Sequence, residues 1–126
     1  MSEADFKQWM DLSGHDADTA ALLIKENGHA DIIIYHIHQA VEKMIKALLV
    51  KNGKAFDKTH FLDKLLAQAI KIDPKLSNIE DDVLAINLYL PKLRYPYGDV
   101  IKFEEAIVIY NKFLAVQKLL RGILHD

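Results

Sequence analysis

The chain has 126 residues, of which 51% are hydrophobic and 27% are charged, with a formal net charge of −2 and no cysteine. This length predicts a single domain spanning residues 1–126 with a sizeable core, and the net charge excludes nucleic-acid binding through overall charge alone. The lack of cysteine excludes disulfides, thiolate nucleophiles and cysteine-ligated metals. No apolar run approaches the ~18 residues of a membrane span, and the polar segment MSEADFKQWM lacks the apolar core of a signal peptide. We therefore expect a cytoplasmic protein that contacts no membrane.

The first two predicted helices are long and have clear ends. Ser2 is a suitable N-cap for the first helix, and Asn27-Gly28 is a pair that commonly ends one. The second helix ends at Gly53. Its apolar residues lie three and four apart on one face. They are Ile34, Ile37, Val41, Met44 and Leu48.

The third and fourth predicted helices are shorter. Thr59 is the expected N-cap of the third helix, which Asp73-Pro74 ends, because a residue before proline disfavours helical geometry. The segment from Ser77 to Glu80 has the sequence of a capping box for the fourth helix. We expect Pro91 to end that helix.

A fifth helix completes the pattern, and no segment alternates as a strand would. Its expected buried stripe consists of Phe103, Ile107, Tyr110, Leu114, Leu120 and Ile123. The five predicted helices lie near residues 3–27, 31–52, 60–72, 78–90 and 102–124. We therefore predict an all-α fold, a five-helix up-and-down bundle, whose long apolar helices leave room for a homodimer interface.

The segment PKLRYPYGDV, residues 91–100, interrupts the helical pattern with two prolines and a glycine. It predicts a rigid, non-helical joint, because Pro96 fixes its own φ and biases Tyr95 to extended geometry, while Gly98 permits a turn. Arg94 suits bidentate binding of a phosphate, with Tyr95 or Tyr97 stacking beside it. The alternative is that Arg94 caps helix-end carbonyls or pairs with an acidic residue while the tyrosines pack.

Other polar residues could face the same ligand. Gln39 and Lys43 are four apart in the second helix, where they form either a polar stripe toward a ligand or partner, or a solvated face. His60 could line the cleft near a helix N-terminus or pack on the second helix. His36 and His38 point apart on a helix, so they cannot chelate one ion.

No pattern in the chain indicates a bound cofactor or a dedicated metal site. The sequence contains no glycine-rich phosphate loop, no HExxH motif and no serine nucleophile motif. We therefore expect neither a metal nor a cofactor.

Three segments in the order HQAVEKMIKALLV (38–50), KTHFLDKLL (58–66) and LRYP (93–96) resemble the HEPN family, the higher eukaryotes and prokaryotes nucleotide-binding domain. Members typically show Gln-Ala-x-Glu-Lys-x-x-Lys-Ala in the second helix, Lys-Thr-His at the start of the third and Arg-Tyr-Pro after the fourth. The resemblance implies a helical, usually dimeric bundle. It also implies a protein that binds a nucleotide or RNA phosphate, or that pairs with a separately encoded minimal nucleotidyltransferase, in some cases as a toxin–antitoxin system.

Another branch of this family consists of metal-independent ribonucleases, whose hallmark is an arginine followed four to six residues later by a histidine. Here no histidine lies in that window after Arg94, and the next one is His125. Because histidine is the side chain that titrates near neutrality, the departure favours a non-catalytic or weakly catalytic protein. The alternatives are a ribonuclease whose histidine comes from elsewhere in the chain or from a second protomer, and a helical scaffold without a ligand.

Overall fold

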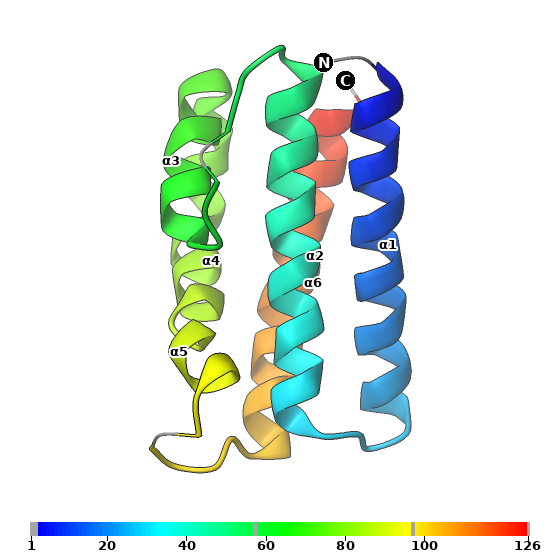
Figure 1. The fold of residues 1–126 in the computed structure, drawn as a ribbon, viewed down its shortest axis with the longest axis vertical. Helices are drawn as coiled ribbons and strands as arrows, with labels where there is room; N and C mark the ends of the chain where they lie inside the picture. The colour runs from blue at the N-terminus through cyan, green and yellow to red at the C-terminus, as the bar shows by residue number, and fades with distance from the viewer. Residues whose placement is uncertain (1–2, 57, 97, 126) are drawn as a thin grey trace.

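The computed structural model describes residues 3–56, 58–96 and 98–125, and within these ranges it contains helices and no strand (Figure 1). The long helices are α1 (Glu3–Lys25), α2 (Ala30–Lys51) and α6 (Phe103–Leu124). Between α2 and α6 lie α3 (Leu62–Ile72), the 3-10 helix η1 (Pro74–Ile79), α4 (Glu80–Asn87) and α5 (Leu90–Arg94). The predicted all-α bundle is confirmed, and the predicted fourth helix is divided into η1, α4 and α5.

The ends of α1 and α2 follow the predicted residues. After α1, Asn27 adopts a φ of 55°, and the N–H of Gly28 donates to the carbonyl of Leu23 at 2.6 Å. This is a Schellman ending, which satisfies carbonyls that the last helical turn leaves open. Gly53 plays the corresponding part after α2 with a φ of 67°. Both predicted stops are confirmed.

Helix α2 is the centre of the bundle, since it contacts α1, α3, α4, α5 and α6. In Figure 1 it stands between α1 on one side and the column of α3 to α5 on the other, with α6 behind it. All five residues of its predicted apolar face are buried, and so are Ile33, Ile45 and Leu49 on other faces. A helix covered on several sides therefore places even its polar residues in contact with neighbouring helices.

The start of α3 and the region around Pro91 differ from the sequence prediction. Helix α3 begins at Leu62, and Thr59 lies before it, where its hydroxyl oxygen accepts the Phe61 N–H at 3.1 Å. The segment around Ser77 belongs to η1 and does not form the predicted capping box. Pro91 lies in the first turn of α5, a position that tolerates proline because its missing N–H would have no helical partner there.

The core-facing line of α6 is also rotated from the predicted stripe. The buried residues are Ala106, Ile109, Phe113, Val116, Leu120 and Leu124. Of the predicted stripe only Leu120 is buried, and Leu114 is 42% exposed. Helix α6 packs against α2, α4 and η1, so it has a wide apolar face. Two neighbouring lines of residues on that face could each be predicted from the sequence as the buried line.

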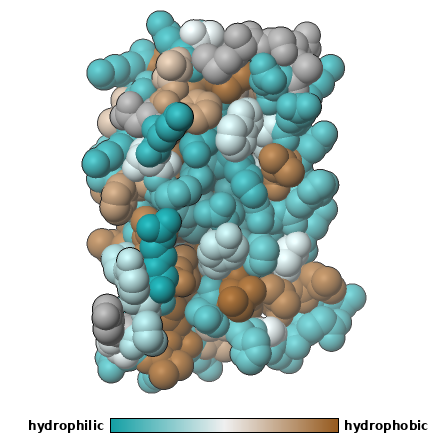
Figure 2. Space-filling model, in the orientation of Figure 1, coloured by the Kyte–Doolittle hydropathy of each residue, from teal (hydrophilic) through white to brown (hydrophobic). Residues whose placement is uncertain are grey.

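The surface on the α2 side is mainly hydrophilic, and hydrophobic side chains gather toward its lower end, over the start of α2 and over α5 (Figure 2). The exposed hydrophobic residues of these segments include Ile32, Tyr35, Leu88 and Tyr95. No helix in the described part of the chain is long and apolar enough to span a membrane.

Candidate functional site

A cavity of about 150 Å³ lies between α2, α5 and the segment that precedes α3. Its lining consists of Tyr35, His38, Gln39, His60, Leu90, Leu93 and Arg94. We call it the Arg94 cavity. Three of the six residues predicted from the sequence, Arg94, Gln39 and His60, therefore meet although they are far apart in the chain.

Arg94 lies in the last turn of α5, so it belongs to a short helix and not to the non-helical joint predicted from the prolines. Tyr95 ends this helix in extended geometry, with φ −134° and ψ 142°, as expected of a residue before proline. Arg94 is exposed and forms no hydrogen bond or salt bridge with any residue that the structure describes. Its five N–H donors are consequently available at the cavity.

The position of α5 depends on an interaction at its other end. Tyr89, the residue before α5, donates its hydroxyl to a carboxylate oxygen of Glu105 in α6 at 2.7 Å. Burial, together with the bond to this carboxylate, raises the pKa of Tyr89 to about 12. The other Glu105 oxygen accepts the Lys102 N–H at 2.8 Å, which lowers the pKa of Glu105. The start of α5 is thereby tied to the first turn of α6.

His60 is held at the cavity by a buried carboxylate. Its Nδ1 lies 3.2 and 3.4 Å from the two carboxylate oxygens of Glu42 in α2. Because a carboxylate only accepts hydrogen bonds, Nδ1 carries a proton and donates it. The Glu42 side chain is 5% exposed, whereas that of His60 is 55% exposed. The second ring nitrogen, Nε2, is therefore the one available to a ligand.

Glu42 is shared with a buried lysine. Lys46 Nζ lies 3.1 Å from Glu42 Oε2, and the lysine side chain is 10% exposed. The rings of Trp9 and Phe56 cover the ammonium, with centroids 5.4 and 5.2 Å from Nζ. The pairing of residues 42 and 46 matches their spacing of four, but the pair lies inside the bundle and not on a solvated face.

His38 is the most unusual residue of the cavity. It is completely buried, and among the described residues neither ring nitrogen has a partner at hydrogen-bond geometry. Burial lowers the pKa of His38, with smaller contributions in the same direction from His60 and Arg94, against opposing ones from Glu42 and Asn87. The Asn87 amide lies close enough for its interaction to oppose this shift, while its oxygen accepts the Leu62 N–H at 2.9 Å. The lowered pKa favours the neutral imidazole, whose two nitrogens stay outside hydrogen-bond geometry with the described residues.

Lys43 does not line the cavity. Its ammonium lies 2.6 Å from Asp16 in α1, and the other oxygen of Asp16 lies 2.8 Å from Nδ1 of His36. At 100° per residue, position 43 is about 40° away from Gln39 and only about 20° from position 36 around the helix. Lys43 consequently faces α1 together with His36. The expected stripe of Gln39 and Lys43 toward one ligand is not formed.

Of the two predicted tyrosines, Tyr95 does not line the Arg94 cavity. Tyr95, 55% exposed, lines a separate hollow of about 290 Å³ with Lys92, Asp31 and the loop up to Ile101. Tyr97 lies outside the described residues. A different tyrosine, Tyr35 of α2, lines the Arg94 cavity and is 45% exposed.

The family model of the HEPN domain matches residues 6–124, nearly the whole chain. The chain belongs to the HEPN family. Comparison with curated proteins and with solved structures finds no match. Membership supports a function that involves nucleotides or RNA in general. The three segments that carried the resemblance, in α2, before α3 and at the end of α5, are those that supply the polar residues of the Arg94 cavity in this HEPN domain.

The sequence interpretation of this HEPN domain missed His38, Tyr35 and Glu42. A signal for His38 was present, because position 38 is in register with Ile34, Val41 and Ile45 at helical spacing. A histidine in such an apolar line is buried and needs an explanation. Among the described residues of the HEPN domain, no group of three or more histidine, aspartate or glutamate residues is arranged to hold a metal ion.

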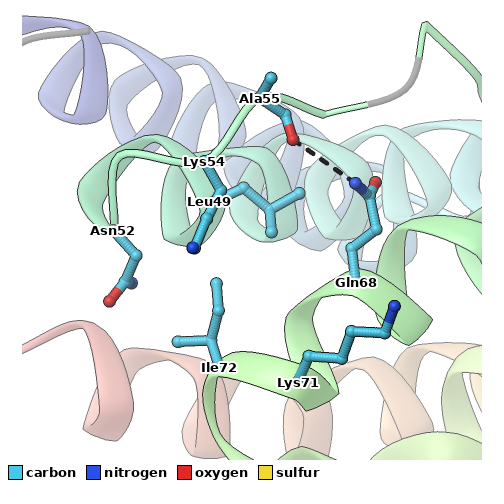
Figure 3. A pocket seen from close by; sticks show the side chains of 7 residues that line it. All are labelled: Leu49, Asn52, Lys54, Ala55, Gln68, Lys71 and Ile72. Atoms are coloured by element: carbon cyan, nitrogen blue, oxygen red, sulfur yellow. Dashed lines mark hydrogen bonds between the residues drawn. The ribbon is translucent and has the colours of Figure 1, made fainter.

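A larger pocket of about 430 Å³ lies between the ends of α2 and α3 (Figure 3). In Figure 3 Leu49 and Ile72 approach the pocket from opposite sides, with Lys54 near Leu49 and Lys71 on the same helix as Ile72. Its amides are already used: the Asn52 amide donates to the Leu48 carbonyl, and the amide of Gln68 donates to Ala55. Because its polar groups are exposed lysines and bonded amides, this pocket is a weaker candidate than the Arg94 cavity.

Proposed function

We propose that this HEPN domain binds a phosphate group of a nucleotide or of RNA in the Arg94 cavity, as a binding protein and not primarily as an enzyme. The observation that carries the proposal is the convergence at one cavity of Gln39, His60 and the Arg94 guanidinium, which is paired with none of the described residues. Guanidinium groups match the geometry of phosphate oxygens through two parallel N–H donors. An amide and an imidazole add donors beside them.

The size of the cavity limits which part of the ligand enters. At about 150 Å³ it is smaller than the roughly 300–1,000 Å³ of pockets that enclose a whole small molecule. A phosphate group fits this description, with the sugar and base outside it. The exposed ring of Tyr35 at the cavity offers a stacking surface for such a base.

The test compares Arg94→Lys and Arg94→Ala with the wild type, using titration with a short single-stranded RNA and with ATP, and thermal melting. We expect Arg94→Ala to weaken binding about tenfold or more and Arg94→Lys to weaken it less, because one ammonium cannot reproduce the two-donor fork. Melting should hardly change, since Arg94 is exposed and forms no hydrogen bond or salt bridge with a described residue. A sharp drop in melting temperature, with no ligand bound by the wild type, would make Arg94 a structural residue in a helical scaffold.

The proposal includes protein partners. Family membership supports pairing with a minimal nucleotidyltransferase, in some cases as a toxin–antitoxin system, and the exposed hydrophobic residues around α5 support a protein contact such as a homodimer. A neighbouring nucleotidyltransferase gene and co-purification of its product would support the first. Light scattering at micromolar concentration tests the dimer, and a strict monomer would contradict it.

A second candidate function is metal-independent cleavage of RNA, favoured by the two histidines beside Arg94. They supply what the segment after Arg94 lacks. His38, held neutral by burial, could accept the 2′-hydroxyl proton, His60 could donate a proton to the leaving 5′ oxygen, and Arg94 could stabilise the charged phosphorane. Cleavage of single-stranded RNA in EDTA that is abolished by Arg94→Ala and by His38→Gln would establish this function. Intact RNA at saturating protein would exclude it.

A further inference from the structure

The contacts of His60 lead to an inference about how the Arg94 cavity holds its ligand. The Glu42 carboxylate is nine-tenths or more buried and contacts two groups, Lys46 on one side and His60 on the other. One buried negative charge therefore lies between a lysine that is enclosed by aromatic rings and a histidine that is half exposed at the cavity.

This arrangement fixes which form of His60 can meet a phosphate. Because Nδ1 donates to Glu42, the neutral form of the ring presents the lone pair of Nε2 to the cavity, and a phosphate oxygen would be repelled by it. Only the doubly protonated ring offers an N–H at Nε2. The Glu42 carboxylate stabilises that cation, since a charge-assisted hydrogen bond favours the charged form.

We propose that binding of a phosphodiester in the Arg94 cavity is coupled to the uptake of one proton by His60, and that Glu42 is the positioning residue that makes this uptake favourable. The inference rests on the proposed function and deepens it. It names a second cationic donor beside Arg94 and a role for the buried Lys46–Glu42 pair, in which the contact with Lys46 holds the carboxylate in place.

The other charged and titratable groups around His60 do not replace it as the proton acceptor. His38 is fully buried, and burial lowers its pKa. In α3, Asp63 accepts a hydrogen bond from the Asn87 amide, and Lys64 lies over the ring of Phe61. The groups near His60 are thus Glu42, which contacts it directly, and His38 from α2 and Arg94 from α5, which line the same cavity. The printed contacts of Asp63 and Lys64 are with other residues.

The expected effect is a pH dependence of affinity with a defined sign. When the ligand-bound state holds one more proton than the free state, the affinity falls by up to about tenfold for each pH unit above the free histidine's titration, and it is constant below that titration. Histidine titrates between pH 5 and 8, so the range is accessible.

The experiment measures the Kd of a 2′-O-methyl RNA hexamer from pH 5.5 to 8.0 at constant ionic strength. This probe has no free 2′-hydroxyl to be cleaved, and its phosphodiesters keep the same charge over this range. We expect the wild-type affinity to fall as pH rises. The affinity of His60→Gln should change less than twofold between pH 5.5 and 8.0. The matched control is His36→Gln, which removes a histidine held by Asp16 outside the cavity and should leave the slope unchanged.

Glu42→Gln tests the positioning role, and we expect it to flatten the pH dependence while Arg94-dependent binding persists. Because this change leaves Lys46 buried without its charge partner, the double variant Glu42→Gln/Lys46→Met provides the same test without a lone buried charge. Histidine ¹⁵N spectra of the wild type should show both His60 nitrogens protonated in the complex at pH 7.

Two results overturn the inference in different ways. If the wild type binds the RNA with the same affinity at every pH, or His60→Gln keeps the wild-type slope, the proton coupling is wrong and the phosphate site stands. If the wild type binds no RNA at any pH, the proposed function and the inference both fail.

Discussion

Replacing His38 by leucine should make the stability of the domain less dependent on pH. His38 is fully buried, its ring nitrogens have no partner at hydrogen-bond geometry among the described residues, and burial lowers its pKa. The folded protein therefore binds no proton at this residue at a pH where the unfolded chain does. The sign of this pH dependence follows: the stability that a neutral His38 contributes is fully present above the unfolded-state pKa of about 6.5. It is lost as pH falls below that value.

The size of the effect follows from one proton. Each pH unit below about 6.5 lowers the free energy of unfolding by up to about 1.4 kcal/mol through His38 alone. At pH 7 the substitution should not reduce stability, because it removes a buried polar group whose missing hydrogen bonds are unfavourable by about 1–3 kcal/mol. The loss of packing around a slightly different side chain opposes this gain.

The assay is urea-induced unfolding followed by circular dichroism at pH 7.5, 6.5 and 5.5. We compare wild type, His38→Leu and the matched control His15→Leu, which makes the same change at an exposed histidine of α1. The free energy of unfolding of His15→Leu should change with pH as that of the wild type does. If His38→Leu loses stability between pH 7.5 and 5.5 as steeply as wild type does, His38 gains its proton equally in both states, and its description as a buried neutral base is wrong.

Three further predictions concern residues outside the cavity. In an alkaline titration Tyr89 should ionise near pH 12. The stability that its raised pKa contributes is present below about pH 10 and is lost as pH rises through 12. Tyr89→Phe should remove this loss. Lys43→Met should lower the free energy of unfolding by about 1–3 kcal/mol, because it removes the ammonium that contacts the buried Asp16 carboxylate. The variant should leave RNA affinity unchanged in a titration. Weakened binding would place Lys43 at the site after all. Gly28→Ala should lower the melting temperature, since the added Cβ would meet a leucine methyl carbon at 2.9 Å. Gly14→Ala should raise the melting temperature, because a Cβ there has nothing within 4 Å. Equal effects of the two variants would contradict the description of the α1 ending.

Helix order, helix ends and the central apolar face of α2 could be predicted from sequence because they depend on local chemistry. The Asn27-Gly28 and Gly53 stops need only residues that tolerate a positive φ. The orientation of α6 could not be predicted in the same way. Its two adjacent apolar lines differ in burial only because α2, α4 and η1 cover one of them, and the sequence of one helix does not contain that information.

The candidate site was predicted only in part, because residue types can be read from the sequence but the packing that brings them together cannot. Arg94, Gln39 and His60 were identified from residue type and family pattern, and the fold brings them to one cavity. Lys43 was placed with them by its spacing of four, but a difference of about 40° around α2 turns it to Asp16. The roles of His38 and Glu42 depend on α5 and the segment before α3 covering that side of α2, which only the tertiary structure shows.

The measurement that tests the central claim most directly is an NMR titration of the wild-type protein with the 2′-O-methyl RNA. It follows the Arg94 Nε–H and the ring signals of His38 and His60. We predict that these signals shift together and saturate with one affinity, while the side-chain signals of Lys54 and Lys71 in the larger pocket stay in place. Shifts confined to those two lysines, with Arg94 unaffected, would contradict the assignment of the Arg94 cavity as the phosphate site.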